Sequence, residues 1–300
     1  MKYMYCFFSI LLTICLISCE NISKDYTFID DLDNTVKVNS AERIVALSGS
    51  FAEVVILSDL NLVGATSDAY TERNIELNDE IINVGSLKNP TLELIISCDP
   101  DFVILSAQIS KHSEIEKNLS QIGITCAYFE TEEFEGYLNM LNILTDISGN
   151  KEAYKQYGLQ IKEEIDHLIS LSVHKDKPKI LLIRAFSTNA YAKDSNNMVG
   201  AMLKDFGCIN IADSEDSLLE ELSMEVIIKE DPDYIFVTTM GSDDAALEYL
   251  ANGIQNHAAW KDLSAIKNGN YITLEKKLFH YKPNALWSES YEKLFDILFN

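Results

Sequence analysis

The chain has 300 residues, of which 47% are hydrophobic and 24% charged, a composition typical of a globular protein with two domains of ordinary size. Its 47 acidic residues outnumber its 24 basic residues and give a formal net charge of −23. Nucleic-acid binding requires clustered Lys and Arg, so this charge argues against a nucleic-acid partner.

Residues 1–18 have the features of an export signal. Lys2 precedes the apolar run YMYCFFSILLTICLI, which is too short for a transmembrane helix. The run ends in Leu16-Ile17-Ser18-Cys19, which resembles the lipobox of bacterial lipoproteins. This resemblance implies that Cys19 becomes the lipidated first residue of the mature chain. The alternative is a secreted protein in which Cys19 has no such role.

An α/β domain is predicted over residues 19–149. After a polar tether, FIDDLDNTVKV predicts a β-hairpin that turns at Asp33-Asn34. The apolar runs IVAL, LVGATS, FVIL and CAYF then predict buried strands separated by helices. Ser50-Phe51-Ala52-Glu53 has the spacing of a capping box at the start of a helix.

A long linker helix and a second α/β domain follow. Gly149-Asn150 ends the preceding helical stretch, and a linker is predicted over residues 150–173. Within this linker, one uninterrupted helix is predicted over residues 151–172. Its apolar stripe has spacings of 3, 4, 4 and 3 and consists of Tyr154, Tyr157, Ile161, Ile165 and Leu168. Such a helix is roughly 33 Å long. The runs KILLI, YIFV and YITL predict the strands of the second domain, residues 174–300.

One segment of fifteen residues occurs twice. TLELIISCDPDFVIL begins at Thr91, and SMEVIIKEDPDYIFV begins at Ser223, 132 positions later, with six identical positions. Each copy predicts a helix with a hydroxyl N-cap and a first-turn carboxylate, Glu93 or Glu225. A proline then ends the helix, and a buried strand follows. The repeat predicts two Rossmann-like α/β lobes with mostly parallel sheets, joined by a single long α-helix.

This organisation resembles the solute-binding proteins of ABC importers for siderophore-iron, haem and vitamin B12. The resemblance covers nearly the whole mature chain and is carried by FIDDLDNTVKV with ERIVAL, the two E-x-I-I-x-x-D-P-D units, NNMVGAMLKDFGCINIA, HAAWKDLSAIKNGNYITL and LFHYKPNALWSESYEKLFDIL. It implies a monomeric binding protein without a cofactor, periplasmic or lipid-anchored to the outer face of the cytoplasmic membrane. It also implies that Glu93 and Glu225 dock into arginine pockets of a permease dimer. Alternatively, both glutamates only complement helix dipoles.

Ligands of parallel α/β sheets bind beyond the carboxyl ends of the strands. The candidates there are Ser48, Gly49, Ser50, Phe51, Ser67, Tyr70, Ser106 and Gln108 in the first lobe, and Arg184, Phe186, Tyr191, Lys193, Met240, His280, Tyr281 and Lys282 in the second. These aromatic, hydroxyl and cationic groups suit a large, flat or chelated anion. The guanidinium of Arg184 can hold a carboxylate in bidentate fashion, although an ion pair within the protein is an equal alternative.

The identity of the ligand stays open between an iron–siderophore complex, haem and a corrinoid. His280 and Met240 form a ligand pair known for haem iron, but a lone His in FHYKPN is more often a loop-fixing hydrogen-bond donor. The five histidines are dispersed, which argues against a site for a free metal ion. Cys98, Cys126 and Cys208 are scattered and predict buried thiols without a disulfide framework.

Two other classes of protein are the alternatives to a binding protein. An exported hydrolase lacks support, because SGS at residues 48–50 is not a G-x-S-x-G nucleophile motif and no Ser or Cys comes with an evident His and acid. A surface adhesion or sensory module would not need the matched glutamates.

Overall fold

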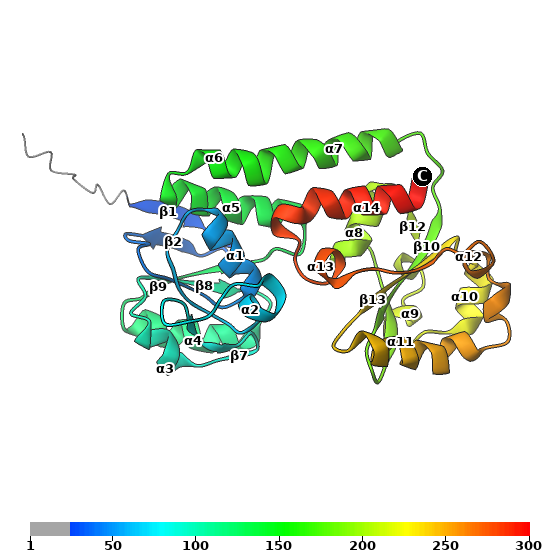
Figure 1. Ribbon diagram of the computed structural model, residues 1–300, viewed down its shortest axis with the longest axis horizontal. Coiled ribbons are helices and arrows are strands. Elements are labelled where there is room, and N and C mark those ends of the chain that lie inside the picture. The colour runs from blue at the N-terminus through cyan, green and yellow to red at the C-terminus, as the bar shows by residue number, and fades with distance from the viewer. Residues whose placement is uncertain (1–24) are drawn as a thin grey trace, which may run out of the picture.

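The computed structural model describes residues 25–300, which form two α/β lobes beneath a shared layer of helices (Figure 1). The predicted signal peptide and Cys19 lie outside the described residues. Among the described residues, no helix is both long and apolar enough to cross a membrane. The predicted α/β fold with two lobes is confirmed.

The first lobe contains a parallel five-stranded sheet with the strand order β5-β4-β3-β8-β9. The predicted strands are all present, and the predicted hairpin is β1 paired antiparallel with β2. The strands are β1 (Tyr26–Ile29), β2 (Thr35–Val38), β3 (Ile44–Ala46), β4 (Leu62–Ala65), β5 (Ile82–Asn83), β6 (Gly85–Ser86), β7 (Asn89–Pro90), β8 (Phe102–Ser106) and β9 (Thr125–Phe129). The helices are α1 (Gly49–Leu57), α2 (Asp68–Arg73), α3 (Leu92–Ser97), α4 (Ser110–Gln121) and α5 (Phe134–Ser148).

The second lobe contains a mixed sheet with the order β11-β10-β13-β14, and β12 also pairs with β10. Only β11 is antiparallel, so the predicted mostly parallel sheet is confirmed. The strands are β10 (Lys179–Ala185), β11 (Ala190–Lys193), β12 (Ile209–Asn210), β13 (Tyr234–Thr239) and β14 (Tyr271–Thr273). The helices and short turns are α8 (Met198–Asp205), η2 (Ile211–Asp213), α9 (Ser217–Glu220), α10 (Met224–Glu230), α11 (Asp243–Asn252), η3 (Ile254–Asn256), η4 (Trp260–Asp262), α12 (Ser264–Lys267), α13 (Lys276–Phe279), η5 (Asn284–Leu286) and α14 (Trp287–Phe299).

The repeated segment forms the same unit in both lobes, a short helix followed by a parallel strand: α3 with β8, and α10 with β13. The backbone N–H of Val226 donates to the Ser223 hydroxyl, as predicted for an N-cap, whereas the Thr91 hydroxyl makes no such bond. Asp99 and Asp231, which precede the two prolines, have left-handed φ values of 48° and 42°. The chain therefore leaves both helices at the predicted place.

The linker helix is continuous but not α-helical throughout. It consists of α6 (Lys151–Tyr154), the π-helical segment η1 (Lys155–Leu159) and α7 (Gln160–Ser172), so the prediction of one uninterrupted α-helix is wrong in its middle. The hydroxyl of Tyr137 on α5 donates to the carbonyl of Tyr157 at 2.8 Å. Gly158 also lies against α5, where an added Cβ would be 2.8 Å from a methyl group of Leu138. A π-bulge is a usual response to such an insertion into the helical hydrogen-bond ladder.

Helix α1 begins earlier than the predicted capping box. Its first residue is Gly49, whose N–H donates to the buried carboxylate of Asp68 at 2.6 Å. An added Cβ on Gly49 would lie 2.5 Å from the backbone nitrogen of Ala69, so only glycine fits. Ser50 therefore lies inside the first turn, and the capping box predicted for Ser50 and Glu53 is wrong.

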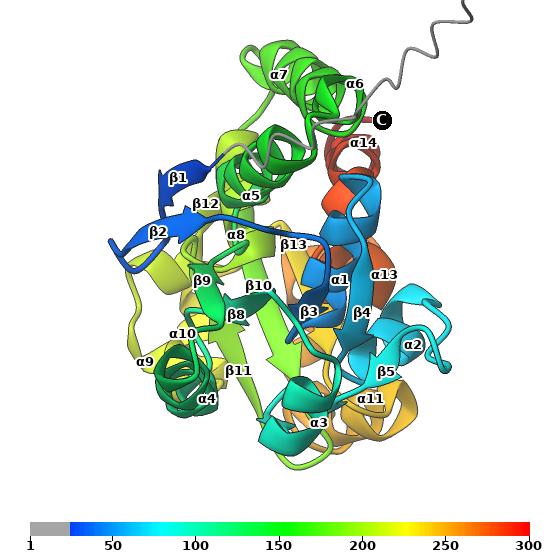
Figure 2. The ribbon, with the colours of Figure 1, turned by 90° about the vertical axis from the view of Figure 1, so that its left-hand side faces the viewer.

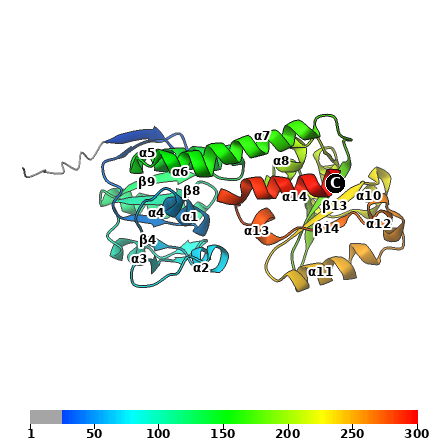
Figure 3. The same ribbon diagram turned by 45° about the horizontal axis from the view of Figure 1, so that its top comes forward.

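A single apolar cluster runs through both lobes. It includes one face of the first sheet, the inner side of the linker helix, one face of the second sheet and helix α14. Helices α5, α7 and α14 lie together above the two sheets (Figures 2 and 3). Between the lobes, the ring of Phe134 on α5 meets Trp287 on α14 edge to face at 5.8 Å. The lobes are therefore two parts of one core, with separate satellite clusters on their outer sheet faces.

Asn284 adds a polar link between the lobes. It is fully buried, with a φ of 51°, and its side-chain amide donates to the carbonyl of Ser50 at 3.0 Å and to the carboxylate of Glu53 at 2.6 Å. The Ser50 hydroxyl donates back to Asn284 at 3.2 Å, and Glu53 pairs with Arg73 at 3.2 Å. The loop between α13 and α14 is thereby attached to α1 of the other lobe.

The three cysteines among the described residues are free, with Cys98 and Cys208 buried and Cys126 half-buried. Burial raises the pKa of Cys126 and of Cys208 to about 12, so both thiols are protonated at neutral pH.

Replacing Asn284 with Ala or Gly should separate its two contributions. Either change removes the amide that donates to the carbonyl of buried Ser50 and to the half-buried carboxylate of Glu53, at a cost of about 1–3 kcal/mol in the free energy of unfolding. Ala should be less stable than Gly by a further ~1 kcal/mol, because a Cβ is disfavoured at this left-handed φ. Urea unfolding followed by circular dichroism measures both variants. Wild-type stability of Asn284→Ala would contradict this role.

Candidate ligand-binding cleft

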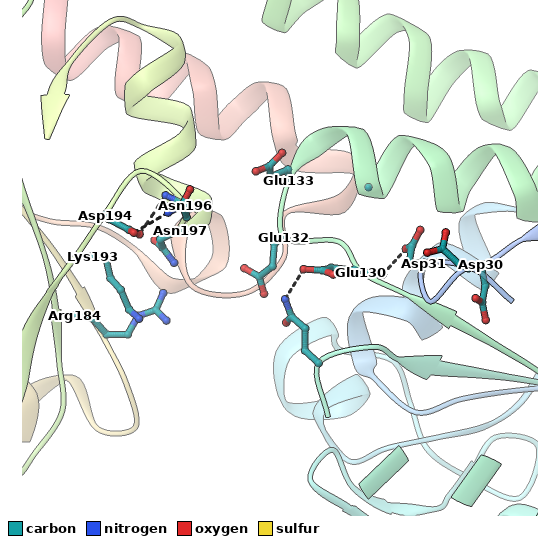
Figure 4. A pocket seen from close by; sticks show the side chains of 13 residues that line it. Asp30, Asp31, Glu130, Glu132, Glu133, Arg184, Lys193, Asp194, Asn196 and Asn197 are labelled. Carbon is teal, nitrogen blue, oxygen red and sulfur yellow. Dashed lines mark hydrogen bonds between the residues drawn. The ribbon is translucent and has the colours of Figure 1, made fainter. Parts of the chain in front are cut away.

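A cleft of about 830 Å³ lies between the two lobes. It is lined by Asp30, Asp31, Asp33, Gln108, Glu130, Glu132, Glu133, Gly136, Arg184, Lys193, Asp194, Asn196 and Asn197. An inner compartment of about 240 Å³ adjoins this cleft and shares five of its lining residues. Among the further residues that line the inner compartment are Ser48, Ser50, Phe51, Ser106, Thr131, His280 and Lys282. Figure 4 shows Arg184 and Lys193 of the second lobe on one side of this space and the labelled carboxylates of the first lobe on the other, with Glu132 and Glu130 nearer to the cations than Asp30 and Asp31.

The first-lobe wall is built at the carboxyl end of β9. The strand ends at Phe129, and the acidic segment Glu130–Glu133 leads directly into α5. The Gln108 amide donates to the carboxylate of Glu130 at 2.9 Å, and the backbone N–H of Glu130 donates to the carboxylate of Asp31 at 2.6 Å. Asp31 in turn belongs to the turn of the β1–β2 hairpin and donates its N–H to the Tyr128 carbonyl. The hairpin and the strand end therefore form one acidic surface.

The carboxylates of this wall repel one another. Burial, together with the negative charges of Glu130 and Asp30, raises the pKa of Asp31, although the N–H of Glu130 partly offsets this. A carboxylate in such a place is stabilised by any positive charge that approaches it.

The second-lobe wall is built on the antiparallel pair β10–β11. Arg184 lies opposite Tyr191 in this register, and Phe186 stacks on Tyr191 with ring centroids 5.6 Å apart. The ammonium of Lys193 lies 4.9 Å from the Tyr191 ring centroid, within cation–π range. Burial lowers the pKa of Arg184 and, together with the charge of Arg184, that of Lys193. Two cations are thus held side by side and partly desolvated.

An ion pair joins the two walls at the inner end of the cleft. The ammonium of Lys282, from the second lobe, contacts the carboxylate of Glu132, from the first. His280 lies nearby, and its burial together with Arg184, Lys276 and Lys282 lowers its pKa to about 4. His280 is therefore neutral at physiological pH.

Three buried polar atoms of the inner compartment have no hydrogen-bond partner among the described residues. They are Oγ1 of Thr131, Nε of Arg184 and Nδ1 of His280. The Arg184 N–H is a donor, the Thr131 hydroxyl can donate or accept, and the neutral ring of His280 can do either according to its tautomer. All three atoms are covered from solvent, so a ligand contacts them only after their side chains turn toward the compartment.

Seven of the ten side chains predicted to bind the ligand line this cleft: Ser50, Phe51, Gln108, Arg184, Lys193, His280 and Lys282. The hydroxyl of Ser50 is already bonded to Asn284. The other three, Tyr70, Tyr191 and Met240, line neither compartment. Tyr70 is 60% exposed on α2, and Met240 follows β13. Tyr191 contacts Phe186 and Lys193 and so supports the wall from behind. Contact of any of these residues with a ligand stays a prediction.

The acidic part of the cleft is absent from the residues predicted from the sequence. Glu130, Thr131, Glu132 and Glu133 directly follow the run CAYF, so the rule of strand ends that selected the other residues points to them as well. Asp31 comes from a hairpin whose position beside β9 depends on long-range packing. Asn196 and Asn197 follow an antiparallel strand that had not been predicted.

The described residues contain no group of three or more His, Cys, Asp or Glu side chains that can hold a metal ion. Away from the cleft, Glu93 and Glu225 are both exposed in the first turns of α3 and α10, at matching positions of the two lobes.

This chain is similar to known proteins over most of its length. The Fe(3+)-citrate-binding protein YfmC of Bacillus subtilis (strain 168) is 26% identical over 287 residues, covering 89% of this chain and 88% of that protein. The putative ABC transporter substrate-binding lipoprotein YhfQ of the same organism is 24% identical over 274 residues, covering 86% and 81%. The crystal structure of S. aureus IsdE complexed with heme has a TM-score of 0.71 and 17% identity, covering 87% of this chain and 100% of that one. The family model "Periplasmic binding protein" matches residues 44–278, and the chain therefore belongs to this family of binding proteins, as its motifs predict.

Proposed function

We propose that this protein is an extracytoplasmic solute-binding protein that captures an iron complex, a siderophore or haem, and delivers it to the permease of an ABC importer. The observation that carries the proposal is the cleft of about 830 Å³ between two α/β lobes of a periplasmic binding protein. A cleft of this size suits a chelate rather than a bare ion. The relatives named for ferric citrate and for an ABC transporter support the iron complex and the permease partner.

The iron is proposed to enter with its own chelator. Among the described residues no cluster of metal-binding side chains is found, and the cleft carries hydrogen-bonding and charged groups that recognise the outside of a complex. Of the pair considered for haem iron, His280 lines the inner compartment and Met240 does not. A His/Met axial pair is therefore not part of the proposal.

Protein purified from its own host should carry the ligand and reveal its class by absorption. We expect either the charge-transfer band of a ferric siderophore or the Soret band of haem, with about one iron per chain. Arg184→Ala should weaken binding of an anionic iron complex roughly 10- to 150-fold, as expected for the loss of a charge-assisted hydrogen bond. Corrinoid bands, or a bound organic solute without iron, would contradict the proposed ligand class.

Permease docking is proposed for Glu93 and Glu225. Both carboxylates are exposed, and each belongs to one copy of the repeated helix–strand unit. Two equivalent acidic positions on two equivalent lobes match a partner with two equivalent basic pockets. Charges at the rim of an interface act through encounter rate and orientation, and a like-charge contact costs several kcal/mol.

Glu93→Lys and Glu225→Lys should each reduce uptake through the reconstituted importer, since each reversal places like charges together. The dissociation constant of the ligand and the melting temperature should stay nearly unchanged, because neither residue lines the cleft. Glu164→Lys, on an exposed position of α7, is the matched control and should transport normally. Docking through these residues is refuted if the double variant retains normal uptake, and a loss of ligand affinity would assign them to binding.

A lipid anchor at Cys19 is proposed from the apolar run that ends in Leu-Ile-Ser-Cys, and a relative named as a lipoprotein supports it. Cys19→Ala should move the protein from the membrane fraction to the soluble fraction or stall its processing. Unchanged membrane retention, together with an unchanged mass in mass spectrometry, would exclude the anchor.

A further inference from the structure

The outer cleft has an excess of negative charge on one side. Seven carboxylates line it, against the two cations Arg184 and Lys193. Both cations belong to the second lobe, and six of the seven carboxylates belong to the first. These six, the acidic set, are Asp30, Asp31, Asp33, Glu130, Glu132 and Glu133. Figure 4 shows this separation, with open space between the two sets.

Some of these carboxylates already have structural roles. Asp30 is buried and accepts hydrogen bonds from the backbone N–H groups of Leu32, Asn34 and Tyr128. Glu132 is neutralised by Lys282. These two carboxylates therefore need no ligand to satisfy them.

Three others, Glu130, Asp31 and Glu133, are exposed and form no ion pair within residues 25–300. Glu130 accepts only from the neutral amide of Gln108, and Asp31 accepts only from a backbone N–H. Glu133 makes neither a hydrogen bond nor an ion pair through its side chain within residues 25–300. The three carboxylates lie on one wall of the ligand cleft, and burial together with the negative charges of Glu130 and Asp30 raises the pKa of Asp31. A positive group placed there would relieve this repulsion.

The inner compartment supplies a second, independent observation. Thr131 is only 3% exposed, and its hydroxyl, the Nε of Arg184 and the Nδ1 of His280 lack hydrogen-bond partners among the described residues. All three side chains line this compartment, and Thr131 is next to Glu130 in the chain. Unpaired buried polar groups are costly, so a polar part of the ligand is expected to complete them. The inner compartment, whose lining also includes Phe51, Leu87, Ile109, Phe129 and Met198, can thus contact oxygen atoms of a chelate beside its apolar parts.

On this basis we propose that the ligand is a ferric complex that bears a protonated amine. The oxygen atoms of its chelating groups face Arg184, Thr131 and His280 in the inner compartment, and its ammonium group faces the acidic wall that carries Glu130, Glu133 and Asp31. The proposal rests on the proposed function, and it narrows the ligand to complexes with a cationic substituent. It disfavours purely anionic complexes, because these would bring negative charge to an acidic wall.

Two ferric trihydroxamates that differ in one charge provide the test. Ferrioxamine B ends in an ammonium group, and N-acetylferrioxamine B is the same chelate with that group made neutral. Titration calorimetry on the mature chain should show the ammonium complex binding roughly 10- to 150-fold more tightly, the range of one charge-assisted hydrogen bond. The preference should decrease at high salt, as ionic contacts are screened.

Two variants test whether the preference for the ammonium complex comes from the first-lobe wall. The double variant Glu130→Gln/Glu133→Gln should bind both complexes with similar affinity, because the amides keep the shape but not the charge. Glu164→Gln, on an exposed position of the linker helix, removes one negative charge outside the cleft and should retain the full preference. Matching circular dichroism spectra confirm that each variant is folded.

The outcomes separate this inference from the proposed function. Equal affinity of the wild type for the two trihydroxamates overturns the inference, as does a preference that survives in the double glutamine variant. Binding of ferric citrate or haem, with neither trihydroxamate bound, overturns the inference and leaves the proposed function standing. Failure to bind any of these ferric complexes overturns both.

Discussion

The apolar cluster shared by the two lobes is the constraint on which the rest of the structure depends. Phe134 at the start of α5 packs against Trp287 at the start of α14, and Trp287 is only 1% exposed. Helix α14 also packs along α7, so the linker helix is buried on one side rather than free between the lobes. A large hinge motion would have to open this core and break the bonds of Asn284 to α1. The cleft is therefore a largely preformed site, and ligand recognition depends on the groups already facing it.

Those groups are distributed unevenly because each wall comes from a different kind of segment. The first-lobe wall follows a parallel strand and enters α5, whose first turn favours carboxylates through the helix dipole. The second-lobe wall lies on an antiparallel pair, where Arg184 and Lys193 pack against Tyr191 and are partly buried. The Glu132–Lys282 pair joins the walls at the inner end. The cleft thus has an acidic side and a basic side, and a ligand has to match both.

Much of the local structure could be predicted from single segments. Apolar runs such as IVAL and FVIL became buried strands, and Pro100 and Pro232 ended their helices, because these outcomes depend on neighbours in the chain. Two local predictions were wrong for non-local reasons. The buried Asp68 fixes the start of α1 at Gly49, and the Tyr137 hydroxyl on α5 coincides with the π-helical segment of the linker. In both cases a side chain distant in sequence, Asp68 or Tyr137, is hydrogen-bonded to the helix backbone where the helix departs from the structure predicted from local sequence.

By itself the sequence determined the lobes, the repeated helix–strand unit and the family, because these follow from the period of apolar residues and from the order of short motifs along the chain. Seven of the ten side chains that it predicted for the ligand site line the cleft, since ligands bind at the carboxyl ends of parallel strands, but the acidic wall was not predicted. Only the tertiary structure decided which charges face each other. The approach of the β1–β2 hairpin to β9, and the pairing of β11 with β10, bring Asp31 to Glu130 and Lys193 to Arg184. Such contacts depend on strand register and packing between distant segments, which no periodicity along the chain encodes.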